Sequence, residues 1–358
     1  MKSNHAMAAV SILVLVMTAN ALQTTGSFQI GGQTRDYILY VPSGASNPPL
    51  VINMHGLGSN ASQQLLYTQF NAIADREKCI VVYPNAINNS WDLAGSTDLD
   101  FISALIDTIA AYYSIDRNRV YATGMSMGGY MSHKLGCQLS DKIAAIAPVA
   151  GLNALNSFCN PGRPVPVLQI HGTADSTVKY SGVATTISGW VQRNGCPQTA
   201  QVTDPYPASN ANSTVKKELY SPCDGNSEVV LLTVEGGGHV WPGGLGSAAD
   251  INASEEVWAF LKRFSLASSN ALPFRGNERI LRMRARRVAG GVSVGIDGKT
   301  TDVRLIDIEG RTAAAWHIGE QAGASARITL PFTGASGLVY LLVGEDGAGG
   351  ALIAPERR

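Results

Sequence analysis

The segment Gly124-Met125-Ser126-Met127-Gly128 places a serine between glycines, a pattern that suits nucleophilic chemistry. The apolar run at residues 120–123 predicts a strand before it, and helical spacing begins at Gly129. A serine on a sharp strand-to-helix turn needs small neighbours because the bent backbone leaves no room for Cβ atoms. Such a turn exposes the Ser126 hydroxyl at a helix N-terminus, where the helix dipole and free N–H groups favour a developing oxyanion. We therefore predict that Ser126 is a nucleophile.

Serine becomes a strong nucleophile only when a nearby histidine accepts its proton, and a carboxylate must orient that histidine. Asp175 fits the carboxylate because it ends the segment HGTAD, directly after the predicted strand at residues 165–170. His239 fits the base because it follows the predicted strand at residues 229–234 and three glycines. One parallel-sheet fold class uses this chain order of serine, acid and histidine. The sequence therefore predicts a catalytic triad of Ser126, Asp175 and His239.

Other histidines and acids are weaker candidates for these roles. His133 lies inside the predicted helix after Ser126, where we expect it to be packed or solvated. His171 ends a strand before a tight turn, so we interpret it as a structural residue that holds the acid loop. Asp204 and Asp224 are alternative acids, but neither directly follows a predicted strand. The histidines also lack the close spacing of metal ligands, so we expect no metal site.

An acyl-transfer site also needs donors for the oxyanion of the tetrahedral intermediate, typically two backbone N–H groups. The first should come from Met127, the residue after the nucleophile. For the second we choose Leu57 in the loop His55-Gly56-Leu57-Gly58, which follows the apolar run at residues 50–54. The alternative interpretation of this loop is an ordinary glycine turn.

The elements that must position these residues follow one pattern up to Phe264. Short, nearly continuous apolar runs alternate with longer stretches that have helical spacing. Uniformly apolar strands alternating with amphipathic helices predict a mostly parallel sheet covered on both faces. Together with the serine turn, this pattern predicts an α/β-hydrolase fold. The predicted strands lie at residues 50–54, 80–83, 120–123, 143–149, 165–170 and 229–234, after an N-terminal hairpin at 28–41.

The composition changes after the last predicted helix. Residues 265–270 are small and polar, and short strands separated by glycines follow without a convincing helix. We predict a signal peptide at residues 1–21, an α/β-hydrolase domain at 22–266, a linker at 267–278 and a small all-β domain at 279–358. The 358 residues include 27 basic and 27 acidic side chains, and this balance argues against a nucleic-acid partner held through phosphate contacts.

The start of the chain predicts export. Lys2 precedes a mostly apolar run at residues 6–17, and Ala19-Asn20-Ala21 has the small-x-small pattern that signal peptidases accept. The alternative interpretation is a buried N-terminal helix. The run is too short to span a bilayer, which needs about 20 apolar residues, and no later segment qualifies. We therefore expect a secreted or cell-surface protein without a membrane span.

Cysteine usage agrees with export because the five cysteines form no metal-ligand spacing. Cys79 opens an apolar run, where a thiol acts as a small buried hydrophobe. The other four can pair in three ways, and their spacing alone does not choose among these. We favour the pairs of sequence neighbours, which are Cys137 with Cys159 and Cys196 with Cys223.

Several of these segments together resemble the secreted esterase and polyhydroxybutyrate depolymerase family, which includes the feruloyl and acetylxylan esterases of carbohydrate esterase family 1. The resemblance covers about residues 37–264. A set of motifs in this order is far more specific than a lone serine between glycines. The motifs are NNSWD at 88–92, RVYAT at 119–123, the serine turn with Cys137 after it, HGTAD at 171–175 and GHVWPG at 238–243.

The resemblance implies ester hydrolysis without a cofactor, by the triad and the oxyanion loop predicted above. The cysteine pattern of the family supports the two neighbouring pairs. The resemblance also brings forward Trp91 and Trp241 as substrate-binding residues that border the acyl or sugar site. Packing aromatics are an equally good interpretation of both tryptophans.

The C-terminal part, residues 272–358, resembles the sorting domains of the type IX secretion system. The similar features are DIEGR at 307–311, GLVYLLV at 337–343 and a basic terminus. An arginine-rich start at residues 275–287 departs from that pattern. A carbohydrate-binding module is a second interpretation, poorly supported because Trp316 is the only tryptophan in this part, and a passive β-module is a third.

From the sequence we expect a secreted serine carboxylic-ester hydrolase that acts through an acyl-enzyme, on feruloyl or acetyl esters of plant cell-wall xylan. An extracellular poly(3-hydroxybutyrate) depolymerase is the alternative. The alternative from another class is a non-catalytic polysaccharide-binding protein on a hydrolase scaffold. The expected partners are a polysaccharide or polyester substrate and, through the C-terminal domain, the secretion machinery.

Overall fold

The computed structural model describes residues 21–155 and 158–266 with their side chains, and beyond them the backbone of seven strands. The chain divides into two compact units, Met1–Pro273 and Phe274–Arg358. Except for Ala21, the predicted signal peptide lies outside the described residues, as does the predicted linker at 267–278. Both therefore stay predictions.

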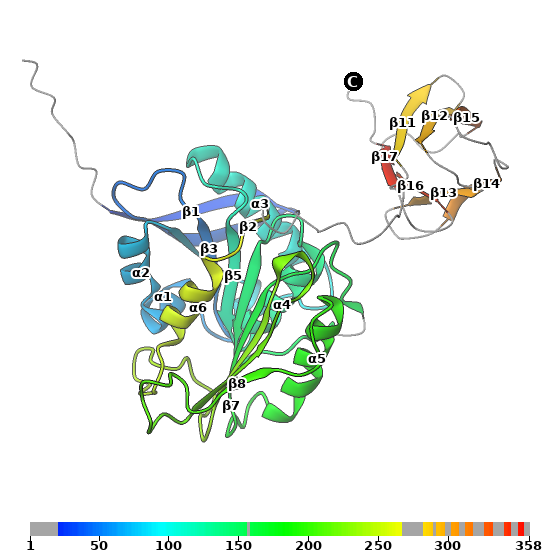
Figure 1. The fold of residues 1–358 in the computed structure, drawn as a ribbon. Helices are drawn as coiled ribbons and strands as arrows, with labels where there is room; N and C mark the ends of the chain where they lie inside the picture. The colour runs from blue at the N-terminus through cyan, green and yellow to red at the C-terminus, as the bar shows by residue number, and fades with distance from the viewer. Residues whose placement is uncertain are drawn as a thin grey trace, which may run out of the picture. The chain divides into compact units, whose positions relative to one another are not determined.

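The first unit is built on a ten-stranded sheet (Figure 1). Its strands are β1 (Leu22–Ile30), β2 (Gln33–Val41), β3 (Leu50–Met54), β4 (Ile80–Pro84), β5 (Val120–Met125), β6 (Ala145–Val149), β7 (Val167–Gly172), β8 (Gln201–Thr203), β9 (Val215–Tyr220) and β10 (Val229–Val234). The spatial order is β1-β2-β4-β3-β5-β6-β7-β10-β9-β8. The strands from β4 to β10 in this order are parallel, whereas both edges are antiparallel. The prediction of a mostly parallel sheet is confirmed.

Helices cover both faces of this sheet (Figure 1). They are α1 (Ala61–Thr68), α2 (Phe70–Glu77), α3 (Thr97–Tyr112), α4 (Met127–Gln138), α5 (Val183–Arg193) and α6 (Ala253–Leu261). Every residue of the parallel strands is buried, because alternate side chains enter two separate cores. Leu50 and Ile52 belong to the core that includes residues of α3, α4 and α5, while Val51 belongs to the core that includes residues of α2 and α6. Among the described helices, none is long and apolar enough to cross a membrane.

The second unit is all-β in its described part. Its strands are β11 (Arg282–Val288), β12 (Gly291–Asp297), β13 (Asp302–Asp307), β14 (Thr312–His317), β15 (Ala326–Pro331), β16 (Tyr340–Gly344) and β17 (Gly350–Ile353). They form a three-stranded sheet, β11-β12-β15, and a four-stranded sheet, β14-β13-β16-β17. All of their pairings are antiparallel. The predicted role of this part in sorting stays a prediction.

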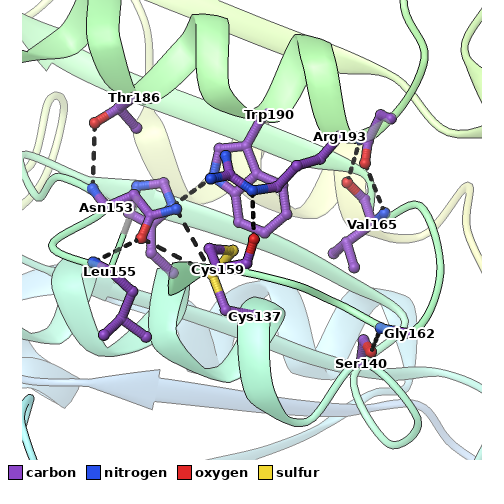
Figure 2. Close-up of a disulfide and its surroundings, with 12 residues drawn as sticks. Cys137, Ser140, Asn153, Leu155, Cys159, Gly162, Val165, Thr186, Trp190 and Arg193 are labelled. Atoms are coloured by element: carbon purple, nitrogen blue, oxygen red, sulfur yellow. Dashed lines mark hydrogen bonds between the residues drawn. A yellow bond between two sulfur atoms is a disulfide. The ribbon is translucent and has the colours of Figure 1, made fainter. Parts of the chain in front are cut away.

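Two disulfides close loops of the first unit. Cys137 bonds to Cys159 and Cys196 bonds to Cys223, which are the neighbouring pairs that the sequence favoured. Figure 2 shows the first of them, which ties the end of α4 to the loop after β6. Arg193 of α5 donates to the Cys159 carbonyl at 2.6 Å and so joins α5 to the same loop. This disulfide therefore restrains the helix that begins next to Ser126.

We expect the double substitution Cys137→Ser with Cys159→Ser to lower the free energy of unfolding by about 3 kcal/mol, because it opens a loop closed across 22 residues. In a domain of this size, that loss corresponds to a fall in thermal midpoint of roughly 6–12 °C. Thermal unfolding followed by circular dichroism measures the fall. The matched control is Cys79→Ala, which removes a buried thiol that takes part in no disulfide. An equal fall in both proteins would contradict a particular contribution of the disulfide.

Candidate active site

Ser126 lies on the turn between β5 and α4. Its backbone has φ 55° and ψ −119°, a strained conformation for a residue with a Cβ atom. The Ser126 N–H donates to the Val149 carbonyl at 2.9 Å, and the Tyr130 N–H donates to the Ser126 carbonyl at 3.0 Å. The end of β6 and the first turn of α4 therefore hold the serine in this conformation.

The glycines beside the serine are required by the end of β3. A Cβ atom at Gly128 would collide with the Met54 carbonyl oxygen, and one at Gly124 would lie 2.8 Å from the Gly128 carbonyl carbon. The backbone of β3 thus approaches the serine turn directly. This close approach explains why the sequence places glycines there.

Asp175 is buried on the loop after β7, and its two carboxylate oxygens have different partners. Oδ1 accepts from the backbone N–H groups of Thr177 and Val178 at 2.9 and 2.8 Å. Oδ2 accepts from Nδ1 of His239 at 2.7 Å. A carboxylate only accepts, so His239 carries its proton on Nδ1, and the lone pair of Nε2 stays free to act as a base.

The loops that carry Asp175 and His239 are joined by their backbones. They follow β7 and β10, which are parallel neighbours with Gly172 opposite Val234. The Ala174 N–H donates to the Gly237 carbonyl at 2.9 Å. A Cβ atom at Gly172 would collide with that same carbonyl, so only glycine allows this approach. The hydrogen bond between His239 and Asp175 therefore rests on two loops that are tied to each other.

The order of strands brings the predicted triad to one edge of the sheet. β5, β6, β7 and β10 are consecutive and parallel, and Ser126, Asp175 and His239 follow the carboxyl ends of β5, β7 and β10. Carboxyl ends of parallel strands meet at the same edge, where ligands bind in open α/β sheets. The His239 side chain is 20% exposed there, so a substrate can reach it from solvent.

The predicted oxyanion loop, residues 55–58, follows β3 and is held from several sides. The Ala86 N–H donates to Nε2 of His55 at 3.1 Å, so the proton of that ring lies on Nδ1 and is donated to the Gly56 carbonyl at 2.7 Å. Burial lowers the pKa of His55 and favours this neutral form. The Gly58 N–H donates to the Asn89 carbonyl at 2.9 Å. The loop is thus preorganised.

The same loop lies beside the nucleophile. A Cβ atom at Gly56 would lie 3.4 Å from Cβ of Ser126 and 3.9 Å from its Oγ. In the described part of the chain, the N–H groups of Leu57 and Met127 have no protein acceptor. Two free donors close to a serine hydroxyl can stabilise the oxyanion of a tetrahedral intermediate.

Trp91 and Trp241 do not face solvent. They are 2% and 0% exposed. Nε1 of Trp91 donates to the His55 carbonyl at 2.8 Å, and Nε1 of Trp241 donates to Oγ of Ser254 at 3.0 Å. Their burial does not support the prediction that they contact substrate and favours the packing interpretation. Trp91 instead anchors the predicted oxyanion loop.

His133 and His171 are both buried, and burial lowers the pKa of each. Their ring nitrogens bond to interior groups, as the structural interpretation expects. Of the alternative acids, Asp204 is exposed after the edge strand β8, and Asp224 begins a short 3₁₀ helix. Neither follows a parallel strand of the sheet.

Tyr67 was not identified from the sequence. Its hydroxyl accepts from the Trp241 N–H at 2.9 Å, and its carbonyl accepts from the Leu245 N–H at 3.0 Å. It therefore anchors the segment after His239 from α1, far away in the sequence. Beside that segment lies a cavity of about 290 Å³, lined by small residues that include Gly236–Gly238 and Ser247–Ala249. Within the described residues, no cluster of three or more histidine, cysteine or acidic side chains could hold a metal ion.

Comparison with known proteins finds esterases. Residues 35–157 match the family model described as esterase, PHB depolymerase. The chain is 33% identical over 239 residues to the bifunctional acetylxylan esterase/xylanase XynS20E of Neocallimastix patriciarum, covering 66% of this chain and 34% of that protein. It is 30% identical over 247 residues to feruloyl esterase C of Emericella nidulans, covering 66% of this chain and 86% of that protein.

The chain thus spans about a third of the bifunctional relative's length but most of the feruloyl esterase's. Among solved structures, the acetyl xylan esterase from Aspergillus awamori has a TM-score of 0.54 at 16% identity, covering 68% of this chain and 99% of that one. At that identity the likeness shows a shared fold.

Proposed function

Because the chain belongs to the family of esterases and polyhydroxybutyrate depolymerases and is a carboxylic ester hydrolase, we propose that it is a secreted serine esterase of plant cell-wall xylan. The observation that carries the proposed mechanism is the 2.7 Å hydrogen bond between Nδ1 of His239 and Asp175. It directs the Nδ1 proton of His239 to Asp175 and leaves Nε2 available as the base, at the edge of the sheet where the half-buried Ser126 lies on its strained turn.

In the proposed reaction, Oγ of Ser126 attacks the ester carbonyl carbon while Nε2 of His239 accepts the hydroxyl proton. The N–H groups of Leu57 and Met127 donate to the oxyanion. Protonated His239 then donates to the leaving alcohol, which departs and leaves an acyl group on Ser126. His239 next takes a proton from water, and the resulting attack releases the acid and restores the serine. Asp175 stabilises the imidazolium in both halves of the reaction.

The substrate proposal is feruloyl or acetyl esters of xylan, supported by relatives whose names are acetylxylan esterase and feruloyl esterase. The second candidate is poly(3-hydroxybutyrate), favoured by the family model that matches residues 35–157. Both polymers present esters that the same triad would cleave.

Parallel assays on methyl ferulate, acetylated xylan and a hydroxybutyrate oligomer test the substrate. We expect turnover of methyl ferulate or acetylated xylan to exceed turnover of the oligomer by at least about tenfold in kcat/KM, a difference of about 1.4 kcal/mol in transition-state binding. Activity confined to the oligomer would overturn the cell-wall proposal. Binding to xylan without hydrolysis of any ester would instead favour the non-catalytic alternative.

We also propose that the protein is exported and that residues 279–358 serve in sorting. The two disulfides support export, since disulfides persist in oxidising compartments. The antiparallel strands in the second unit are compatible with either sorting or carbohydrate binding. Mass spectrometry of the protein from culture fluid tests export. A chain that is retained in the cytoplasm with residues 1–21 intact would contradict export.

A further inference from the structure

A buried chain of polar side chains connects helix α5 to the loop of Asp175. Its members are Trp190, His133, Gln169 and His171, and none is more than 1% exposed. Nε1 of Trp190 lies 3.0 Å from Nδ1 of His133, and Nε2 of His133 lies 3.0 Å from Oε1 of Gln169. Nε2 of Gln169 lies 3.2 Å from Nδ1 of His171. Four polar side chains from α4, α5 and β7 are thus connected inside the core.

The groups at the ends of this chain fix the direction of every hydrogen bond in it. The indole N–H of Trp190 can only donate, so Nδ1 of His133 accepts and its proton lies on Nε2. That proton is donated to Oε1 of Gln169, whose NH₂ group donates to the Gly151 carbonyl at 2.9 Å and to His171. Nδ1 of His171 is therefore an acceptor, and its proton lies on Nε2.

This proton points at the groups that hold the predicted catalytic carboxylate. Nε2 of His171 lies 2.7 Å from the Val178 carbonyl and 3.4 Å from Oδ2 of Asp175. The Val178 N–H donates to Oδ1 of the same carboxylate. His171 therefore acts on Asp175 through the backbone of Val178, and its Nε2 also lies close to Oδ2 of the carboxylate.

We propose that His171 is a positioning residue for Asp175 and that the chain from Trp190 through His133 and Gln169 exists to keep the His171 proton on Nε2. This inference rests on the proposed function, because it assigns Asp175 to the triad. It adds residues that touch neither the nucleophile nor the base.

Burial of these four side chains explains why one tautomer of His171 is favoured over the other. Burial lowers the pKa of His133 to about 4 and lowers that of His171, so both rings stay neutral and each has one donor and one acceptor nitrogen. A neutral ring with its proton on Nδ1 would face the Gln169 NH₂ group with a second donor. It would also leave the Val178 carbonyl without its partner. Buried polar groups without partners are costly, so the alternative tautomer is disfavoured.

Two substitutions at residue 171 separate positioning from packing. A glutamine side chain reaches the place of Nε2 and can donate there, whereas an asparagine reaches only the place of Nδ1. Both remove the ring and both are polar amides. We expect His171→Asn to lower kcat on an activated ester about tenfold or more with little change in KM, because small displacements of a triad member are costly. We expect His171→Gln to restore kcat to within about threefold of the wild type.

The comparison needs one reference variant and one stability measurement. Ser126→Ala must be inactive, and if it hydrolyses ester at the wild-type rate, the proposed function fails before the positioning role is judged. With Ser126→Ala inactive, an equal kcat for His171→Asn and His171→Gln would overturn the positioning role. A fall in kcat that simply follows the fall in thermal midpoint across both variants would overturn it too. A larger loss in His171→Asn at a similar midpoint would support it.

Discussion

The Ser126→Ala variant is expected to retain less than about one ten-thousandth of the wild-type kcat while keeping its fold. Without the Oγ atom, no acyl-enzyme forms, and only binding and the oxyanion donors can assist attack by water. The remaining backbone contacts of residue 126 use main-chain atoms, which alanine preserves. Alanine keeps the same strained φ of 55° with a smaller side chain, so we expect little change in the thermal midpoint.

Stopped assays with p-nitrophenyl acetate measure kcat, and the mass shift after treatment with a fluorophosphonate measures labelling of the nucleophile. The matched control is Ser188→Ala, which removes an exposed hydroxyl from α5 and should keep full activity. Hydrolysis or labelling that survives in purified Ser126→Ala would remove Ser126 from the mechanism.

The central strands could be predicted because they are buried on both faces. A strand such as β4 is continuously apolar, and a short apolar run of this kind is typical of a strand in a covered parallel sheet. The predicted limits differ from the observed ones by a few residues at β6 and β7, where apolar residues continue into the adjoining loops. The short edge strand β8 and its partner β9 were not predicted, since their residues are mostly partly exposed and polar.

The predicted triad could be derived because each member follows a recognisable strand in an order set by topology. Apart from His171, which the sequence assigned to the acid loop, the support around the triad could not be derived. Trp91 holds the His55 carbonyl across 36 positions, and Tyr67 holds the Trp241 N–H across 174. Nothing in the local sequence distinguishes a buried tryptophan that donates to a loop carbonyl from one that stacks on a sugar. Only the fold decides between these roles.

Asp175→Asn is expected to lower kcat by about ten-thousandfold, close to the loss in Ser126→Ala, although it changes only one atom of the side chain. The reason lies in the partners of the two carboxylate oxygens. Two backbone N–H groups, those of Thr177 and Val178, donate to Oδ1, so the amide oxygen of asparagine must occupy that place. The NH₂ group then replaces Oδ2 and faces Nδ1 of His239, which must become an acceptor. The His239 proton moves to Nε2, and the ring can no longer accept a proton from Ser126.

The size and hydrogen bonding of asparagine at Oδ1 are unchanged, so we expect the variant to fold and to bind substrate with a similar KM. The control is Asp204→Asn, an equal change of charge at an exposed acid that the proposed site does not use. Kinetics on p-nitrophenyl acetate and methyl ferulate, with thermal midpoints for both proteins, complete the comparison. Asp175→Asn could keep more than about a tenth of the wild-type kcat, or Asp204→Asn could lose a larger share of kcat than Asp175→Asn does. Either result would mean that the bond between His239 and Asp175 is structural rather than catalytic.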